Sequence, residues 1–269
     1  MQIRKPWLGK CALLICLAAF QAGQVRAENA SQPLEEVVVT STRSEQKSFD
    51  LPAPVSVVDS QRISQTAPAS MADILQDVPG VEMERAGSWE ASPIIRGLGS
   101  NRVLVLIDGD RETNLWAGRS PLNPFADVGN IERVEVVKGP ASALYGTDAL
   151  GGVINIITKD AAFADQDQWQ TQSTVNTRYS TTDNALYGRY ELAAGGNGFG
   201  FNLGISGRNS ENYEDGRGNE VNNSQFESQS VDLRTKYDIS ERQELSASVR
   251  INAIDDQGVP QKNAQAPFS

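Results

Sequence analysis

The sequence predicts a compact α+β unit followed by the first strands of an antiparallel transmembrane β-barrel, which we expect to be incomplete in this chain. Two observations predict this order. Residues 51–162 combine a capped helical segment with short apolar strands, whereas residues 163–269 alternate between apolar and polar side chains. Alternation over segments of about 10 residues is typical of strands that cross a membrane.

The first 27 residues have the pattern of a secretion signal. Three basic residues precede an apolar core at residues 11–20, and residues 25–27 suit a signal peptidase. The apolar core has about 10 residues, whereas a helix that spans a bilayer needs roughly 20. An N-terminal anchor helix is the alternative. We therefore expect an exported chain and leave residues 1–27 out of the fold.

Export changes what the composition implies. Both cysteines lie within residues 1–27, and loss of this segment takes the net charge from −10 to −14, because it carries four basic and no acidic residues. An exported chain without disulfides suggests the bacterial envelope rather than a small disulfide-linked secreted domain. The acidic balance argues against nucleic acid as a partner, since that binding requires a basic face.

Residues 28–50 form a polar tail with one apolar feature. Three β-branched valines, Val37 to Val39, lie between Glu36 and Thr40. β-branched residues favour extended structure. The tail therefore predicts a short strand-prone peptide with flexible flanks.

Residues 51–162 have the pattern of a unit that can bury a modest core. An apolar strand is expected at residues 54–58, and a helix follows in which Ser70 and Asp73 form a capping box. Pro79-Gly80 is expected to end this helix. Further strands are expected at residues 102–109, 131–138 and 151–158, with one helical turn at residues 141–145.

Residues 163–269 are expected to form about five barrel strands. Phe199, Phe201, Leu203 and Ile205 share one face of a strand, and small or polar residues share the other. Tight turns alternate with a long polar loop at residues 209–225, as in outer-membrane barrels. A soluble sandwich also alternates, but it would not need so many charged side chains on its polar faces unless those faces met water. The same pattern recurs at residues 169–179, 186–193, 231–239 and 245–253.

Five strands are too few to close a barrel around the preceding unit, because eight strands already fill their interior with side chains. An open sheet edge is also an aggregation hazard. We therefore expect the chain to be the front part of a longer protein, or a truncated product that does not transport.

Two segments of the α+β unit carry a family resemblance. Residues 94–111 read IIRGLGSNRVLVLIDGDR, and residues 131–159 read IERVEVVKGPASALYGTDALGGVINIITK. They resemble the plug domain of TonB-dependent outer-membrane receptors, and the resemblance runs from about residue 35 to residue 159 and into the barrel strands. Within the family the chain looks closest to the ferric-catecholate and colicin I receptor group, the cobalamin receptor and the heme receptors.

The resemblance implies active uptake of a scarce nutrient across the bacterial outer membrane. It implies TonB as the partner that delivers force, outer-membrane lipid around the barrel, and phage or colicin as further candidate partners. An extended peptide that adds a strand to a partner's sheet suits the transfer of force. In this family the peptide that TonB binds is called the TonB box. The resemblance assigns to it Glu36, Val37, Val38, Val39 and Thr40.

The resemblance also implies ion pairs between plug and barrel. Arg96, Glu132 and Glu135 carry charge on or near apolar strands and are expected to hold the plug in place. A solvated strand face is the alternative for each residue. Burial of such pairs is costly unless they are well satisfied, so a plug that must move can use pairs that are readily undone.

The cargo is left open between a ferric siderophore, heme and cobalamin, with an iron complex as the first choice. Heme receptors commonly use histidine as an iron ligand, and the chain has no histidine. Catecholate siderophores are anionic, so basic and aromatic plug residues are candidate contacts. A solvated charge or a packing aromatic is the alternative for each of Arg85, Trp89, Arg102, Arg111, Trp116 and Arg119.

No cofactor and no catalysis are expected. The loop at residues 209–225 carries Glu211, Glu214, Asp215 and Glu220, which could hold calcium, but the spacing fits no EF-hand and a solvated loop is the favoured interpretation. The mature chain lacks histidine, cysteine and a G-x-S-x-G motif, and its glycines do not complete a dinucleotide fingerprint. A signalling or adhesion protein without transport is the remaining alternative.

Overall fold

A computed structural model gives the fold of the chain. It describes residues 37–38, 46–47, 54–66, 68–85, 91–111, 127–240, 243–256, 258 and 260. All of them belong to one compact unit, Glu36–Ser269. The predicted secretion signal lies outside the described residues. Among the described helices, none has the length and apolar character needed to span a membrane.

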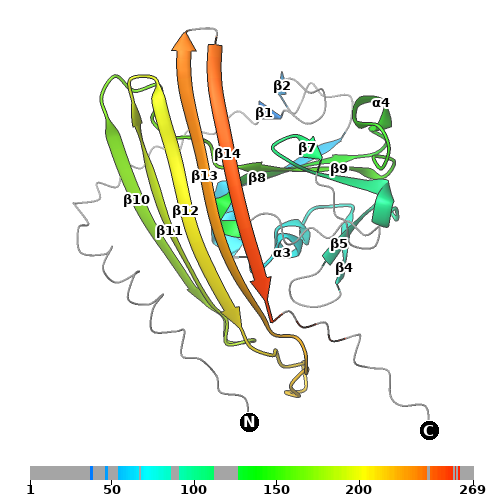
Figure 1. Cartoon of the computed structure of the whole chain (residues 1–269). Coiled ribbons are helices and arrows are strands. Elements are labelled where there is room, and N and C mark those ends of the chain that lie inside the picture. The colour runs from blue at the N-terminus through cyan, green and yellow to red at the C-terminus, as the bar shows by residue number, and fades with distance from the viewer. Residues whose placement is uncertain are drawn as a thin grey trace. The chain divides into compact units, whose positions relative to one another are not determined.

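A five-stranded sheet forms the centre of the α+β unit, which we call the plug (residues 54–160; Figure 1). The strand order is β3-β8-β9-β6-β7, with β6 parallel to β9 and the other neighbours antiparallel. Strands β6 and β9 are mostly apolar, as expected where both faces are covered, whereas β8 carries four charged residues. The bounds are β3 Val55–Asp59, β6 Val103–Ile107, β7 Asp110–Arg111, β8 Ile131–Lys138 and β9 Gly152–Thr158.

Short helices and a hairpin cover this sheet. The Asp73 carboxylate accepts the backbone N–H of Ser70 at 2.9 Å, as the predicted capping box requires. Helix α3 nevertheless ends at Leu75, earlier than predicted, because residues 76–80 form turns. The remaining elements are α2 Ser60–Thr66, α3 Met71–Leu75, β4 Val81–Arg85, β5 Ala91–Ile95, η3 Ser100–Arg102, η4 Val128–Asn130 and α4 Ser142–Tyr145.

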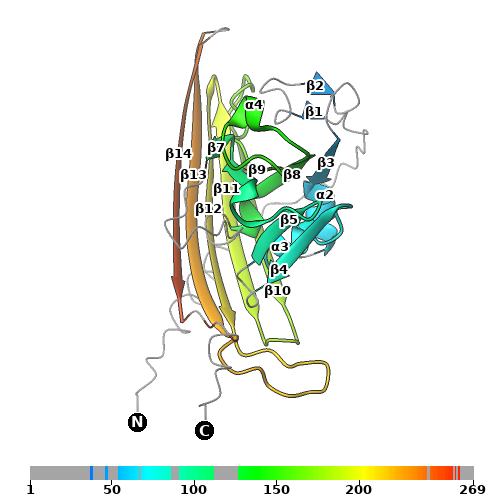
Figure 2. The ribbon, with the colours of Figure 1, turned by 90° about the vertical axis from the view of Figure 1, so that its right-hand side faces the viewer.

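A second sheet of five long strands, which we call the wall, follows the plug (Figure 1). Each strand pairs antiparallel with the next in sequence order, and β10 and β14 are the two edges, so the sheet is open. Figure 2 shows the plug elements along one face of these strands. The bounds are β10 Gln170–Tyr179, β11 Leu186–Gly196, β12 Phe199–Ser210, β13 Phe226–Ser240 and β14 Gln243–Asp255.

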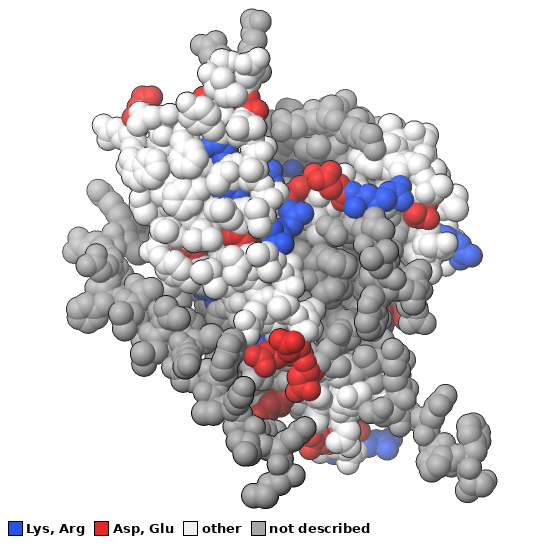
Figure 3. All heavy atoms as spheres, viewed as in Figure 1, with Lys and Arg blue, Asp and Glu red and all other residues white. Residues whose placement is uncertain are grey.

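Burial in the wall is inverted relative to a soluble sheet. Val249 and Ile251 are 53% and 61% exposed, whereas the side chain of Arg250 between them is 22% exposed. White atoms, which mark uncharged residues, make up most of the surface over these strands (Figure 3). A soluble sandwich buries its apolar face, and a barrel strand presents it to lipid. The wall therefore has the pattern of a partial barrel.

The apolar cores of the molecule belong to the plug. One cluster joins α2 and α3 to one face of the plug sheet, and a second packs on the other face around Leu104, Leu106 and Val153. Both clusters consist of plug residues alone among the residues that the structure describes. Neither cluster therefore extends from the plug into the wall.

Candidate functional site

The first polar contact between plug and wall centres on Arg189 of β11. Its side chain has no exposed surface and donates to Asp127 of the plug at 2.9 Å. It also donates to Asp232 of β13 at 2.7 and 3.0 Å and to Glu191 at 3.3 Å. Lys159 of the plug binds Glu191 at 2.6 Å. Charge-assisted hydrogen bonds thus compensate the burial of this guanidinium.

The second contact centres on Asp108, which ends β6 in the turn before β7. Its Oδ2 atom accepts Arg234 Nη1 at 3.1 Å and Arg250 Nη1 at 2.8 Å, so β13 and β14 meet the plug at one oxygen. The backbone N–H of Thr158 donates to Oδ1 at 2.8 Å. Arg234 Nε also donates to Asp160 Oδ1 at 2.9 Å. Asp108 has a φ of 52°, a conformation that Asp and Asn tolerate better than most residues.

The third contact is a stack of two arginines on one tyrosine. The guanidinium carbons of Arg178 and Arg208 lie 5.5 and 5.3 Å from the ring centroid of Tyr187. Arg178 donates to the carbonyl of Pro68 at 3.2 Å, and Arg208 donates to the carbonyl of Ala69. These carbonyls directly precede α3, so the two arginines attach the N-terminal end of α3 to the wall.

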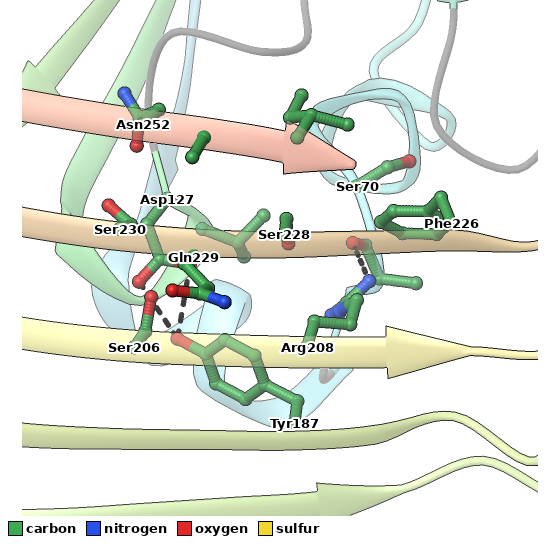
Figure 4. Close-up of a pocket in the computed structure, with 14 residues that line it drawn as sticks. Ser70, Asp127, Tyr187, Ser206, Arg208, Phe226, Ser228, Gln229, Ser230 and Asn252 are labelled. Atoms are coloured by element: carbon green, nitrogen blue, oxygen red, sulfur yellow. Dashed lines mark hydrogen bonds between the residues drawn. The ribbon is translucent and has the colours of Figure 1, made fainter. Parts of the chain in front are cut away.

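A small pocket of about 70 Å³ lies beside the stack (Figure 4). Ser206, Ser230 and Asn252 are register partners on β12, β13 and β14 and form a polar row along it. Figure 4 shows the Tyr187 hydroxyl bonded to Asp127 at its rim. Pockets for cargo-sized ligands measure about 300–1,000 Å³. The pocket therefore suits water-sized molecules rather than cargo.

The predicted TonB box falls partly within the described residues. Val37–Val38 form strand β1 and pair antiparallel with β2, Gln46–Lys47. The extended form that three valines predict is therefore present at these two positions. Glu36, Val39 and Thr40 lie outside the described residues.

The three residues predicted to pair with the barrel have different surroundings. Glu135 is fully buried and binds Arg133 of its own strand at 2.8 Å. Glu132 is exposed, and the backbone N–H of Arg96 donates to Gly80 at 3.2 Å. Among the described residues, neither Arg96 nor Glu132 has a carboxylate or cation within ion-pair distance. Their role in holding the plug stays a prediction.

Lys138 lies beside Arg96 and connects three elements of the plug. Its ammonium donates to Ser56 Oγ at 2.7 Å and to the Pro79 carbonyl at 3.0 Å. Burial, together with the nearby Arg96 charge, lowers the pKa of this ammonium. The two cations thus form a local positive site on the plug.

The predicted cargo-binding residues are only partly described. Arg85 binds Asp73 at 2.7 Å, and Arg111 binds Asp148 at 2.9 Å, so both arginines already have carboxylate partners. Arg102 is exposed in η3. Within the described residues no contact joins these three arginines, and their role toward cargo stays a prediction. Trp89, Trp116 and Arg119 lie outside the described residues.

The carboxylates of the long loop shape the loop itself. Asp215 accepts the backbone N–H groups of Arg217 and Asn219 at 2.8 and 2.9 Å, and these bonds lower its pKa. Glu220 accepts the Asn212 amide at 2.7 Å. In the described part of the chain no group of three His, Cys, Asp or Glu side chains could hold a metal ion. Calcium in this loop stays a prediction.

Sequence reasoning did not single out the residues at the centres of the plug–wall contacts. Arg189, Arg234 and Arg250 lie on the polar faces that alternation predicts, near the middle of strands. Ionisable side chains at membrane depth often mark function, and this signal could have identified them. Their plug partners Asp108 and Asp127 carry no comparable signal.

Comparison with known proteins identifies the plug. Residues 47–153 match the family model described as the TonB-dependent receptor plug domain. The chain carries the plug domain of the TonB-dependent receptor family. The predicted boundaries at residues 51 and 162 lie near those of this match and stay predictions.

Relatives that share this plug differ in their names. The vitamin B12 transporter BtuB of Vibrio vulnificus is 47% identical over 129 residues, which cover 47% of this chain and 21% of that protein. The hemin receptor of Yersinia pestis is 32% identical over 192 residues, covering 71% and 27%. The chain thus spans about a quarter of the length of these relatives. These two relatives are named as a transporter and a receptor.

A solved structure has the same fold. FpvA of Pseudomonas aeruginosa in a pyoverdine–iron complex superimposes with a TM-score of 0.68 at 17% identity, over 81% of this chain and 27% of that one. The same protein is described as an outer membrane receptor. The likeness shows that a plug followed by the strands of a partial barrel is the fold of this chain.

Proposed function

We propose that this chain acts in a TonB-dependent receptor of the bacterial outer membrane, which takes up a scarce nutrient, an iron complex such as a ferric siderophore. The observation that carries the proposal is the order of its parts. A strand-forming valine segment precedes a plug of the receptor family, and a sheet with exposed apolar and buried polar residues follows it.

The nature of the contacts between plug and wall supports the proposal that the plug moves during uptake. Its described apolar clusters contain no wall residue, so displacement leaves the core of the plug intact. The contacts described between plug and wall include ion pairs and arginine–carbonyl bonds, which water can replace. TonB would deliver the force through Val37–Val38, where strand addition makes backbone hydrogen bonds carry the load.

Two observations support an iron complex as the cargo. The chain has no histidine, a common ligand in heme receptors, and the FpvA structure holds a pyoverdine–iron complex. Cobalamin is the second candidate, because BtuB of Vibrio vulnificus is 47% identical over 129 residues. Growth on a ferric catecholate, on heme or on cobalamin, with and without the gene, separates these cargoes.

Substitution of Val38 tests the coupling to TonB. Val38→Pro removes a backbone donor and stiffens the chain, so uptake of the cargo should cease while cargo binding at the cell surface persists. Val38→Ile keeps the donor and the β-branch and serves as the matched control, with uptake retained. Uptake that survives Val38→Pro at an unchanged receptor level would overturn the proposal.

A further inference from the structure

We propose that Arg234 and Arg250 form an anion-binding site on the wall, which Asp108 of the plug occupies at rest and an anionic group of the cargo occupies in transit. The chemical class is a carboxylate or a catecholate. This inference rests on the proposed function, because it requires that the plug leaves and that cargo passes along the wall.

Two arginines of the wall bind carboxylates of the plug. Arg234 Nη1 and Arg250 Nη1 converge on the single Oδ2 atom of Asp108, at 3.1 and 2.8 Å. Arg234 Nε binds Asp160, also of the plug, at 2.9 Å. Within the described residues, every ion pair of these two arginines is with the plug. Removal of the plug therefore leaves two cations together on the wall.

The neighbouring contact at Arg189 behaves differently. Its guanidinium keeps two wall carboxylates, Asp232 and Glu191, when Asp127 leaves with the plug. Asp232 is the register partner of Arg250, but Arg189 already binds both of its oxygens at 2.7 and 3.0 Å. Wall carboxylates thus neutralise Arg189. In the described part of the chain, the carboxylates paired with Arg234 and Arg250 all belong to the plug.

The two arginines are close on adjacent strands. Arg234 is the register partner of Ser248, two residues before Arg250, so the two side chains are diagonal neighbours on one face. Both lie near the middle of their strands, within Phe226–Ser240 and Gln243–Asp255. Ionisable residues at membrane depth that face an interior often mark a substrate path.

Guanidinium chemistry defines what the site takes. Arginine presents planar pairs of donors that match a carboxylate or a similar pair of anionic oxygens. With the plug in place, the side chains of Arg234 and Arg250 are 27% and 22% exposed, so the Asp108 carboxylate that they bind is only partly screened by water. The Asp108 carboxylate at rest has the same charge and oxygen pair that an anionic cargo would present, so one anion can replace another.

A binding measurement that needs neither TonB nor a known cargo tests this site. The experiment uses the full chain, purified in detergent micelles. Asp108→Asn removes the negative charge that occupies the site at rest, and Asn tolerates the positive φ of this position. Calorimetric titration with citrate at fixed ionic strength should give about tenfold or greater tightening over the unaltered chain, the equivalent of one charge-assisted hydrogen bond. Asp108→Asn combined with Arg250→Gln should lose this gain.

Asp59→Asn is the matched control, because it removes a plug carboxylate that accepts the backbone N–H of Arg62 at 2.7 Å rather than a wall arginine. It should leave citrate affinity unchanged. Asp160→Asn is the second variant should Asp108→Asn fail to fold. The Asp160 side chain is 65% exposed, and within the described residues its one ion pair is with Arg234, so a smaller tightening, about threefold, is expected.

Two results would overturn the site: citrate affinity in the folded Asn variant equal to that of the unaltered chain, or tightening that persists with Arg250→Gln. Neither result bears on uptake through TonB. Conversely, uptake that survives Val38→Pro would overturn the proposed function and leave the citrate titration unchanged.

Discussion

Arg189 of β11 reaches across strand β12 to bind Asp232 of β13 through two parallel hydrogen bonds, at 2.7 and 3.0 Å. Gly204 of β12 lies beneath this pair and is the register partner of both Glu191 and Asp232. A Cβ atom at Gly204 would overlap the guanidinium of Arg189. The absence of a side chain at residue 204 is therefore what allows the two charges to meet.

Gly204→Ala should destabilise the protein. The added methyl group must displace Arg189 from Asp232, and overpacking of this kind costs roughly 1–3 kcal/mol. Gly207→Ala on the same strand is the matched control, because its Cβ would have no neighbour closer than 4.0 Å. Thermal unfolding in micelles measures both. Equal melting temperatures for the two variants would contradict this account of Gly204.

Arg189→Met should be more damaging than Gly204→Ala. It leaves the buried Asp232 and Asp127 carboxylates without their cation, and removal of one partner of a buried pair costs about 3–5 kcal/mol. Addition of Asp232→Leu should recover part of the loss, because the uncompensated wall charge is then gone. Thermal unfolding of the single and double variants measures this. A double variant less stable than Arg189→Met would contradict the charge argument.

The turn at Asp215 should loosen in acid. Hydrogen bonds from Asn219 and Arg217 lower the pKa of Asp215 below its ordinary value of 3.8. A lowered pKa means that the bonds are fully present above pH 3.8 and are lost as the pH falls through the lowered value. Amide exchange at Asn219 should therefore accelerate below that pH, beyond the intrinsic pH effect.

Asp215→Asn is the control for the acid response, because an amide oxygen can still accept both N–H groups but does not titrate in this range. Its exchange at Asn219 should follow only the intrinsic pH dependence. The same acid response in the variant and the unaltered chain would show that another group controls the turn.

The sequence predicted the strands well because their signal is local. Alternation predicted strands within β12 and β14, although both strands extend beyond the predicted residues, and it placed Arg234 and Arg250 on the polar face. Helix α2 was not predicted, because Ile63 is its only buried apolar residue and a single apolar residue gives no helical periodicity in the sequence. Hairpin β4–β5 was also missed, since its strands are short and β5 contains Pro93.

The candidate site was less predictable than the fold because its partners are distant in sequence. Arg250 binds Asp108 over a separation of 142 residues, and no spacing rule joins such positions. The family resemblance directed attention to Glu135, which binds Arg133 of its own strand at 2.8 Å and whose role toward the barrel stays a prediction. The polar faces could be predicted, but the pairing across two sheets required the fold.

The plug and the wall require different surroundings. The plug buries its own apolar residues and can complete its core in water, whereas the wall leaves Val249, Ile251 and Leu245 uncovered until lipid meets them. If the wall inserts in lipid, as the proposed function requires, assembly in two stages follows from this difference. A plug that has already folded can serve as a charged template, on which strands arriving at the membrane find their register through a few arginines.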